Sequence, residues 1–152
     1  MTLEDIISKK DSNALMQLDD NELDDLIMKL YYECYSKTDI SELNEAQLNI
    51  YLCSFLEDCT QADTAYTFIE EGMGRYILRA AAAYDAVGAP ETAALVREMA
   101  ELIPEAVLDG EEPDDELMDK LMEFDEQISD YPDGIMSKLY REYARKHSAE
   151  IL

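Results

Sequence analysis

The chain has 152 residues, of which 47% are hydrophobic, and its 36 Asp and Glu against 12 Lys and Arg give a formal net charge of −24. This balance argues against direct nucleic-acid binding, because phosphate contacts need clustered Lys and Arg, and against docking on anionic lipid. A chain this acidic with few apolar residues would be disordered, but here the apolar residues recur at helical spacing. We therefore expect a single folded domain over residues 1–152 with an acidic surface.

Residues 3–18 predict one short helix or two, and Asp20 or Asn21 is expected to cap a helix that runs to about Lys37. The apolar residues of this second segment form an i, i+3, i+4, i+7 series, which is typical of one buried helix face. That series comprises Leu23, Leu26, Ile27, Leu30, Tyr31 and Cys34.

The next segment begins at Asn44, which forms the pattern of a capping box with Gln47. Asp63 is expected to cap a third helix, which Gly72 and Gly74 interrupt or end. The helix behind Asn44 is predicted to bury Leu48, Tyr51, Leu52, Phe55, Leu56 and Cys59.

An alanine-rich helix is predicted over residues 76–87, and the small side chains of residues 80–83 would let a neighbouring helix approach closely. Gly88 suits the position after its C-terminus, and Pro90 suits the first turn of the following helix. Pro104 ends that helix. Its predicted buried residues are Leu95, Val96, Met99, Leu102 and Ile103.

The last third is expected to contain an acidic loop and helix over residues 104–131, capped at Asp114, and a basic C-terminal helix over residues 135–152. A turn at Pro132-Asp133-Gly134 separates the two helices. No segment alternates like a strand, so the predicted fold class is all-α, a single compact domain of roughly seven or eight helices. We expect its core to include Leu26, Leu30, Leu52, Phe55, Leu56, Leu95, Leu121 and Leu139.

Charge is unevenly distributed along the chain. Between Glu101 and Asp133 there are fourteen acids, and Lys120 is the only base. The last nineteen residues reverse the sign, since Lys138, Arg141, Arg145 and Lys146 outnumber the acids there. The basic C-terminal helix therefore predicts either internal ion pairs or contact with a second subunit.

The acidic helix carries a row of carboxylates at steps of three and four residues. We predict that this row is an interaction surface, to which Asp20, Asp24 and Asp25 contribute; the alternative is a solvated face that only aids solubility. One row is too sparse to imitate duplex DNA by itself, so acids elsewhere or a second subunit must contribute. The row comprises Glu112, Glu116, Asp119, Glu123, Glu126 and Asp130.

The sequence contains no motif for catalysis or for binding a metal or a cofactor. We therefore expect a protein that is not an enzyme and that binds no specific metal and no cofactor. His147 is the only histidine, which leaves the serines and cysteines without a general base. Residues 109–119 are acidic but lack the register of a calcium loop. Cys34, Cys53 and Cys59 show no ligand spacing and are expected to be reduced, buried thiols.

Several short patterns carry a family resemblance. They are Leu48-x-x-Tyr51-Leu52, Tyr66-x-Phe68, Gly72, the Ala80–Ala83 helix, the Val87-Gly88-Ala89 turn, Ala93-Ala94, Leu121-x-x-Phe124-Asp125 and Leu139-Tyr140-x-x-Tyr143. The core of the resemblance, residues 43–103, is similar to a bacterial family of largely unknown function that is typified by a neisserial DNA-mimic protein. The resemblance implies an all-helical fold and a homodimer, and for the typical member it implies occupation of a DNA-binding transcription factor.

One position departs from the family, which commonly has Asn-Gly-Gly where this chain has Gln61-Ala62-Asp63. The lead hypothesis is an acidic helical module that covers the basic surface of a nucleic-acid-binding protein, such as a transcription factor or a nuclease. Two alternatives stay open: an immunity or antitoxin-like protein that neutralises a cationic toxin, and a hydrolase that uses paired carboxylates. No apolar run reaches the roughly 18 residues of a membrane span, and residues 1–5 lack the start of a signal peptide, so we expect a cytoplasmic protein without membrane contact.

Overall fold

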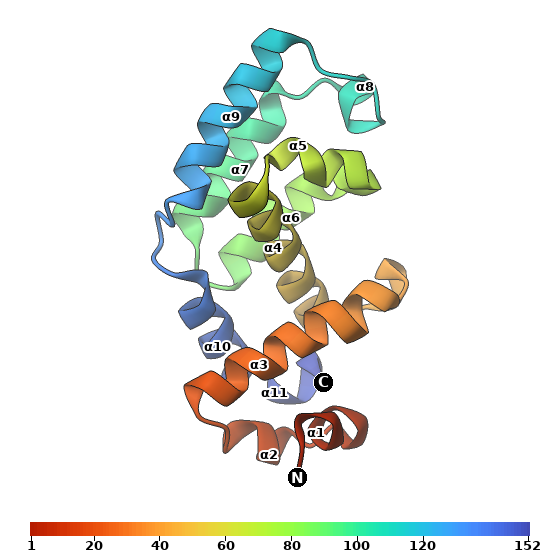
Figure 1. Cartoon of the computed structure of the whole chain (residues 1–152), viewed down its shortest axis with the longest axis vertical. Helices are drawn as coiled ribbons and strands as arrows, with labels where there is room; N and C mark the ends of the chain where they lie inside the picture. The colour runs from red at the N-terminus through yellow and green to blue at the C-terminus, as the bar shows by residue number, and fades with distance from the viewer. The chain divides into compact units, whose positions relative to one another are not determined.

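The computed structural model describes residues 1–152 and consists of helices joined by short turns (Figure 1), which confirms the predicted all-α fold class. Seven α-helices have seven or more residues, and shorter helical elements bring the total above the roughly seven or eight predicted. The seven longer α-helices are α1 (Leu3–Lys9), α3 (Asp20–Lys29), α4 (Glu45–Ala62), α6 (Ile77–Ala86), α7 (Pro90–Leu102), α9 (Asp115–Ser129) and α10 (Met136–Lys146). None of the helices combines the length and apolar composition that a membrane span requires.

The remaining helical elements are short. Four are α-helical turns: α2 (Ser12–Met16), α5 (Ala65–Phe68), α8 (Glu105–Leu108) and α11 (Ser148–Ile151). Two are π-helical, η1 (Leu30–Cys34) and η4 (Ile69–Met73), and three are 3-10 turns, η2 (Tyr35–Lys37), η3 (Ile40–Glu42) and η5 (Gly74–Tyr76).

Internal contacts divide the chain into two compact units. Unit 1 comprises residues 1–51 and 135–152, and unit 2 comprises residues 52–134, so α4 contributes to both. Each unit has its own core of fully buried apolar side chains. In unit 1 these include Leu15, Leu23, Leu26, Leu30, Ile50 and Ile151, and in unit 2 Leu52, Leu56, Phe68, Tyr84, Met99 and Leu121.

In unit 1, α3 packs against α10, and α2 packs against α11. The cap of α3 is Asp19 rather than Asp20 or Asn21: its Oδ1 accepts the Glu22 N–H at 2.8 Å, and Glu22 Oε1 accepts the Asp19 N–H at 3.1 Å. This reciprocal pair is a capping box, which needs the acceptor one residue earlier than the sequence analysis placed it. Helical structure then continues through η1 and η2 to Lys37, as predicted.

α4 begins with the predicted capping box, since Asn44 Oδ1 accepts the Gln47 N–H at 2.9 Å and Gln47 Oε1 accepts the Asn44 N–H at 3.1 Å. Its buried residues lie all around the helix axis and include the polar Asn49, Ser54 and Thr60. One predicted face therefore describes this helix poorly: Leu52, Leu56 and Cys59 are buried, but Leu48, Tyr51 and Phe55 are only half-buried.

In unit 2, α6 packs against α7, and α7 lies beside α9 (Figure 1). Ala80, Ala81 and Ala83 are fully buried, so small side chains do line the interior face of α6. Gly88 has φ +93° after α6, and Pro90 opens α7, as predicted. Of the predicted core, Phe55, Leu95 and Leu139 are half-buried, and Leu102, predicted as buried, is 42% exposed because it lies in the last turn of α7.

The expected acidic loop contains the one-turn helix α8, which packs closely on η5. A Cβ atom added at Gly74 would lie 2.4 Å from the backbone oxygen of Leu108, so only glycine permits this approach. The neighbouring Arg75 holds the same segment through two hydrogen bonds from its guanidinium to the carboxylate of Asp109, at 2.8 and 2.6 Å.

Replacing Gly74 with alanine should lower the free energy of unfolding by about 2 kcal/mol, because the backbone of α8 must move away. Gly72→Ala is the matched control: it has open space but φ +84°, so its cost should be about 1 kcal/mol, from backbone strain alone. Urea unfolding measures both costs. Hydrogen exchange should accelerate at residues 105–111 in Gly74→Ala only, and equal acceleration in the two variants would contradict the close approach.

Candidate interaction surface

The acidic helix α9 begins at Asp115, after Glu112, the first member of the predicted carboxylate row. Asp114 caps α9 as predicted, because its Oδ1 accepts the Leu117 N–H at 2.8 Å. Glu112 precedes this cap and Pro113, so it lies off the helix and does not continue the row. Instead it lies beside Tyr66, Glu70 and Met118.

The remaining members of the row occupy the outer face of α9. Glu116, Asp119, Glu123 and Glu126 are exposed helical residues, and Asp130 is the exposed residue at the C-terminal cap. Lys120 Nζ lies 3.5 Å from Glu116 Oε1, whereas the other four carboxylates have no basic partner. The structure therefore brings five of the six predicted acids onto one element, four of them without a counter-charge.

The opposite face of α9 packs against α5 and α7. Leu117, Leu121 and Ile128 are buried there, and Phe124 is half-buried. Asp125 lies on this same face and is only 7% exposed, a position that the sequence analysis missed. The signal was available, because Asp125 stands four residues after Leu121 and three before Ile128.

Asp125 caps a helix from a distance. Its Oδ1 accepts the Ala65 N–H at the start of α5 at 2.7 Å, while its Oδ2 is buried without a hydrogen-bond partner. Burial raises the pKa of Asp125 to about 6, the hydrogen bond from Ala65 opposes this shift, and the nearby charge of Asp63 adds to it. Asp63, predicted to be the cap, instead accepts the Thr67 hydroxyl at 3.0 Å.

A second acid caps α7 in the same way. Asp133, in the predicted turn, accepts the N–H of Glu91 at 3.0 Å, and both the N–H and the hydroxyl of Thr92 at 2.7 Å. These bonds satisfy donors that the first turn of a helix leaves open, and a carboxylate there suits the helix dipole. Asp114, Asp125 and Asp133 are thus structural acids within the most acidic part of the chain.

Gln61-Ala62-Asp63, where the sequence departs from the family pattern, makes contacts with other helices. Gln61, in the last turn of α4, donates from Nε2 to the backbone oxygen of Ser129 at 2.9 Å. The sequence Gln61-Ala62-Asp63 therefore connects the end of α4 to the end of α9, while Asp63 contacts α5.

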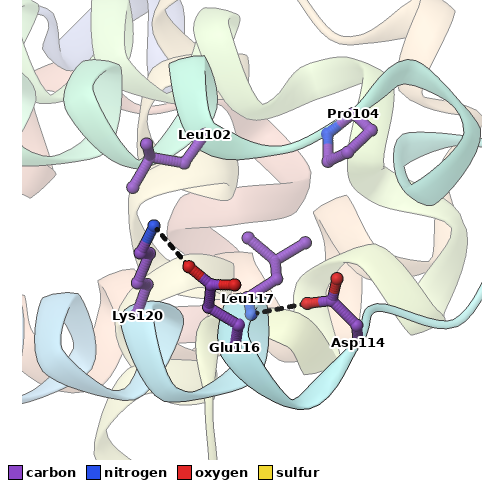
Figure 2. Close-up of a pocket in the computed structure, with 6 residues that line it drawn as sticks. All are labelled: Leu102, Pro104, Asp114, Glu116, Leu117 and Lys120. Atoms are coloured by element: carbon purple, nitrogen blue, oxygen red, sulfur yellow. Dashed lines mark hydrogen bonds and ion pairs between the residues drawn. The ribbon is translucent and has the colours of Figure 1, made fainter.

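Two hollows flank the first turn of α9. One, of about 180 Å³, is lined by Leu102, Pro104, Asp114, Glu116, Leu117 and Lys120 (Figure 2). The other, of about 200 Å³, is lined by Tyr66, Glu70, Glu112, Pro113 and Met118. Each hollow combines apolar walls with two carboxylates, which is chemistry suited to a long cationic side chain.

In unit 1 the predicted acids are largely neutralised. Arg141 lies 2.9 Å from Asp24 and 3.7 Å from Asp20, and Arg145 lies 2.8 Å from Asp20. The hydrogen bond from Arg145 lowers the pKa of Asp20. The basic C-terminal helix therefore forms internal ion pairs with α3, which is one of the two alternatives that its charge allowed. Of Asp20, Asp24 and Asp25, only Asp25 lies outside these pairs, and it is exposed.

His147 stacks on Tyr143, with ring centroids 4.3 Å apart, and its Nδ1 lies 2.6 Å from Glu150 Oε2. No group of three or more His, Cys, Asp and Glu side chains is arranged to hold a metal ion. The three cysteines are free; Cys53 and Cys59 are buried, and Cys34 is partly exposed. Burial raises the pKa of Cys59 to about 12.

A family model described as DMP19-like protein matches residues 41–147, more than two thirds of the chain. The chain belongs to the DMP19-like family. This confirms the resemblance to the family typified by a DNA mimic. The DMP19-like region includes all of α4 to α10 and therefore the acidic face of α9, whereas α1, α2 and α3 lie outside it. No curated protein and no solved structure matches the chain.

The buried carboxylate of Asp125 predicts a specific dependence of stability on pH. Its pKa is raised in the folded state from 3.8 to about 6, so the ionised group destabilises the fold above pH 6, and this cost disappears as the pH falls toward 4. Asp125→Asn keeps the acceptor for Ala65 without the charge. We expect this variant to be more stable than the wild type by about 1–2 kcal/mol at pH 8, and equally stable near pH 4.

Urea unfolding of both proteins at several pH values measures this difference in the free energy of unfolding. The contribution of all other acids is the same in both proteins and therefore cancels in the difference. Asp63→Asn is the companion variant, because loss of its charge should lower the pKa of Asp125 and move the transition to lower pH. A difference between Asp125→Asn and the wild type that stays constant from pH 4 to pH 8 would contradict the assignment.

Proposed function

We propose that this protein is an acidic interaction module whose unit 2 occupies the basic surface of a DNA-binding protein in place of DNA. Membership of the DMP19-like family supports this function, and the α9 row lies within the matched region. The proposed action is stoichiometric binding without turnover, so it requires neither a catalytic residue nor a cofactor.

The observation that carries the proposal is the charge of unit 2. Residues 52–134 contain 22 Asp and Glu against 4 Lys and Arg, a net charge of −18 out of the −24 of the chain. Three of those four bases are already in ion pairs, Arg75 with Asp109, Arg97 with Asp85, and Lys120 with Glu116. Local pairing therefore leaves the outer face of α9 negative.

The geometry of α9 suits recognition by a basic protein surface. Acids three and four residues apart are separated by about 5 Å along a helix that rises 1.5 Å per residue. Duplex DNA carries one charge per ~1.7 Å of axis, so the row supplies part of the pattern and the acids of the two hollows supply more. The packed apolar side chains of α9 hold the backbone of the helix in place, which limits the backbone entropy lost on binding.

A triple variant tests the row. Asp119→Asn, Glu123→Gln and Glu126→Gln together should weaken binding to the native partner at least tenfold and flatten its salt dependence, because three of the charges that attract the partner are gone. Folding should be unchanged or slightly improved, since repulsion falls. The partner is obtained by capture from native cell extract at low salt and elution at high salt, and binding is then measured by calorimetry at several salt concentrations.

The matched control is the triple variant Glu42→Gln, Glu45→Gln and Glu142→Gln, which removes three exposed acids from unit 1. Its net charge equals that of the α9 triple variant. Equal weakening by the two triple variants would show that only the net charge matters and would reject the row. Competition by duplex DNA then tests mimicry, since simultaneous binding of DNA and this protein to the partner would rule it out. If the partner is a toxin and duplex DNA does not compete with this protein for it, the immunity-type alternative is favoured.

A further inference from the structure

We propose that the hollow between α7 and α9 is a docking site for a single arginine side chain of the basic partner, and that Lys120 occupies this site in the free protein. The inference rests on the proposed function in one respect: the arginine is taken to belong to the basic partner proposed above. The hollow lies in unit 2, between the last turn of α7 and the first turns of α9 (Figure 2).

The walls of the hollow suit the aliphatic part of such a side chain. Leu102 and Pro104 come from the end of α7 and the residues after it, and Leu117 from α9 forms the apolar side opposite them (Figure 2). Leu102 is 42% exposed, so its side chain is accessible to a ligand in the hollow. The volume, about 180 Å³, suits one side chain and is below the ~300–1,000 Å³ of small-molecule pockets.

The carboxylates of the hollow suit the cationic end. One oxygen of Asp114 accepts the Leu117 N–H, which leaves its other oxygen for a ligand, and the side chain of Glu116 is 80% exposed. A planar guanidinium can lie against apolar walls and donate to two carboxylates at once, whereas an ammonium is more strongly hydrated. Two side-chain carboxylates are too few for calcium, which takes 6–8 oxygen ligands.

Lys120 shows that the hollow accepts a cation. Its ammonium points to Leu102 and Glu116 (Figure 2), and its Nζ lies 3.5 Å from Glu116 Oε1, longer than the usual charge-assisted bond of about 2.7–2.9 Å. The pair is also exposed, with side-chain accessibilities of 48% for Lys120 and 80% for Glu116. Exposed pairs of this kind contribute little, so an incoming guanidinium can displace the lysine.

The test uses the full chain and the capped tripeptide acetyl-Gly-Arg-Gly-amide, followed by amide chemical shifts in NMR. Saturating shifts should concentrate at residues 102–104 and 114–120, and the lysine tripeptide should bind more weakly. Lys120→Gln should bind the arginine peptide about two- to fivefold more tightly, because the competing cation is gone. Leu102→Ser, a change at an exposed position, should weaken binding.

Lys138→Gln is the matched control, since Lys138 also pairs with an acid four residues away, Glu142 at 4.0 Å, and its loss changes the net charge equally. Equal effects of Lys120→Gln and Lys138→Gln, or shifts spread along Asp119, Glu123 and Glu126 without saturation, would overturn the docking site. Neither result affects the proposed function, which depends on the α9 row and on the native partner. Conversely, failure of the triple-variant test leaves the peptide measurement intact.

Discussion

Mutual repulsion of carboxylates is the constraint that the rest of this structure has to satisfy. In unit 2, 22 acids in 83 residues must be brought close together by folding, which opposes the gain from burying apolar surface. Two of these acids offset part of the repulsion by capping helices: Asp114 caps α9 and Asp133 caps α7, each with its charge against the positive end of a helix dipole. Asp125 caps α5 as well, but its burial makes the ionised form costly, as its raised pKa shows. Acids themselves therefore help to connect α5, α7 and α9.

The structural acids and the exposed acids have different consequences for function. Capping acids accept N–H groups of the fold, although Asp114 uses only one carboxylate oxygen for this, and the acids opposite Arg75 and Arg97 form ion pairs. Four acids on the outer face of α9 have neither role, and the proposed function assigns them to the basic partner. In the proposed complex, the hollow at the start of α9 would add apolar contact to this charge and so give a basic partner a defined position as well as attraction.

Unit 1 uses its acids in another way. Asp20 and Asp24 on α3 are opposed by Arg141 and Arg145 on α10, so charges 117 to 125 residues apart in sequence cancel in space. Its acids outnumber its bases by only 14 to 8, and the acidic character of the chain is therefore concentrated in unit 2. The DMP19-like match covers all of unit 2 and also α10 of unit 1, whereas α3 lies outside it.

The sequence by itself determined the helices, the capping box at Asn44 and the turn residues, because helical periodicity and caps are set by neighbours three or four positions apart. The caps predicted at Asp20 or Asn21 and at Asp63 were wrong. The sequence also determined that α9 has one apolar and one acidic face. The spacing of Asp125 from Leu121 and Ile128 places it on the apolar face, but only the tertiary structure decided what its carboxylate contacts, because its partner is the Ala65 N–H at the start of α5. The ion pairs of Asp20 and Asp24, the cap at Asp133 and the hollow beside Leu102 likewise join residues distant in the chain, and no local pattern specifies such contacts.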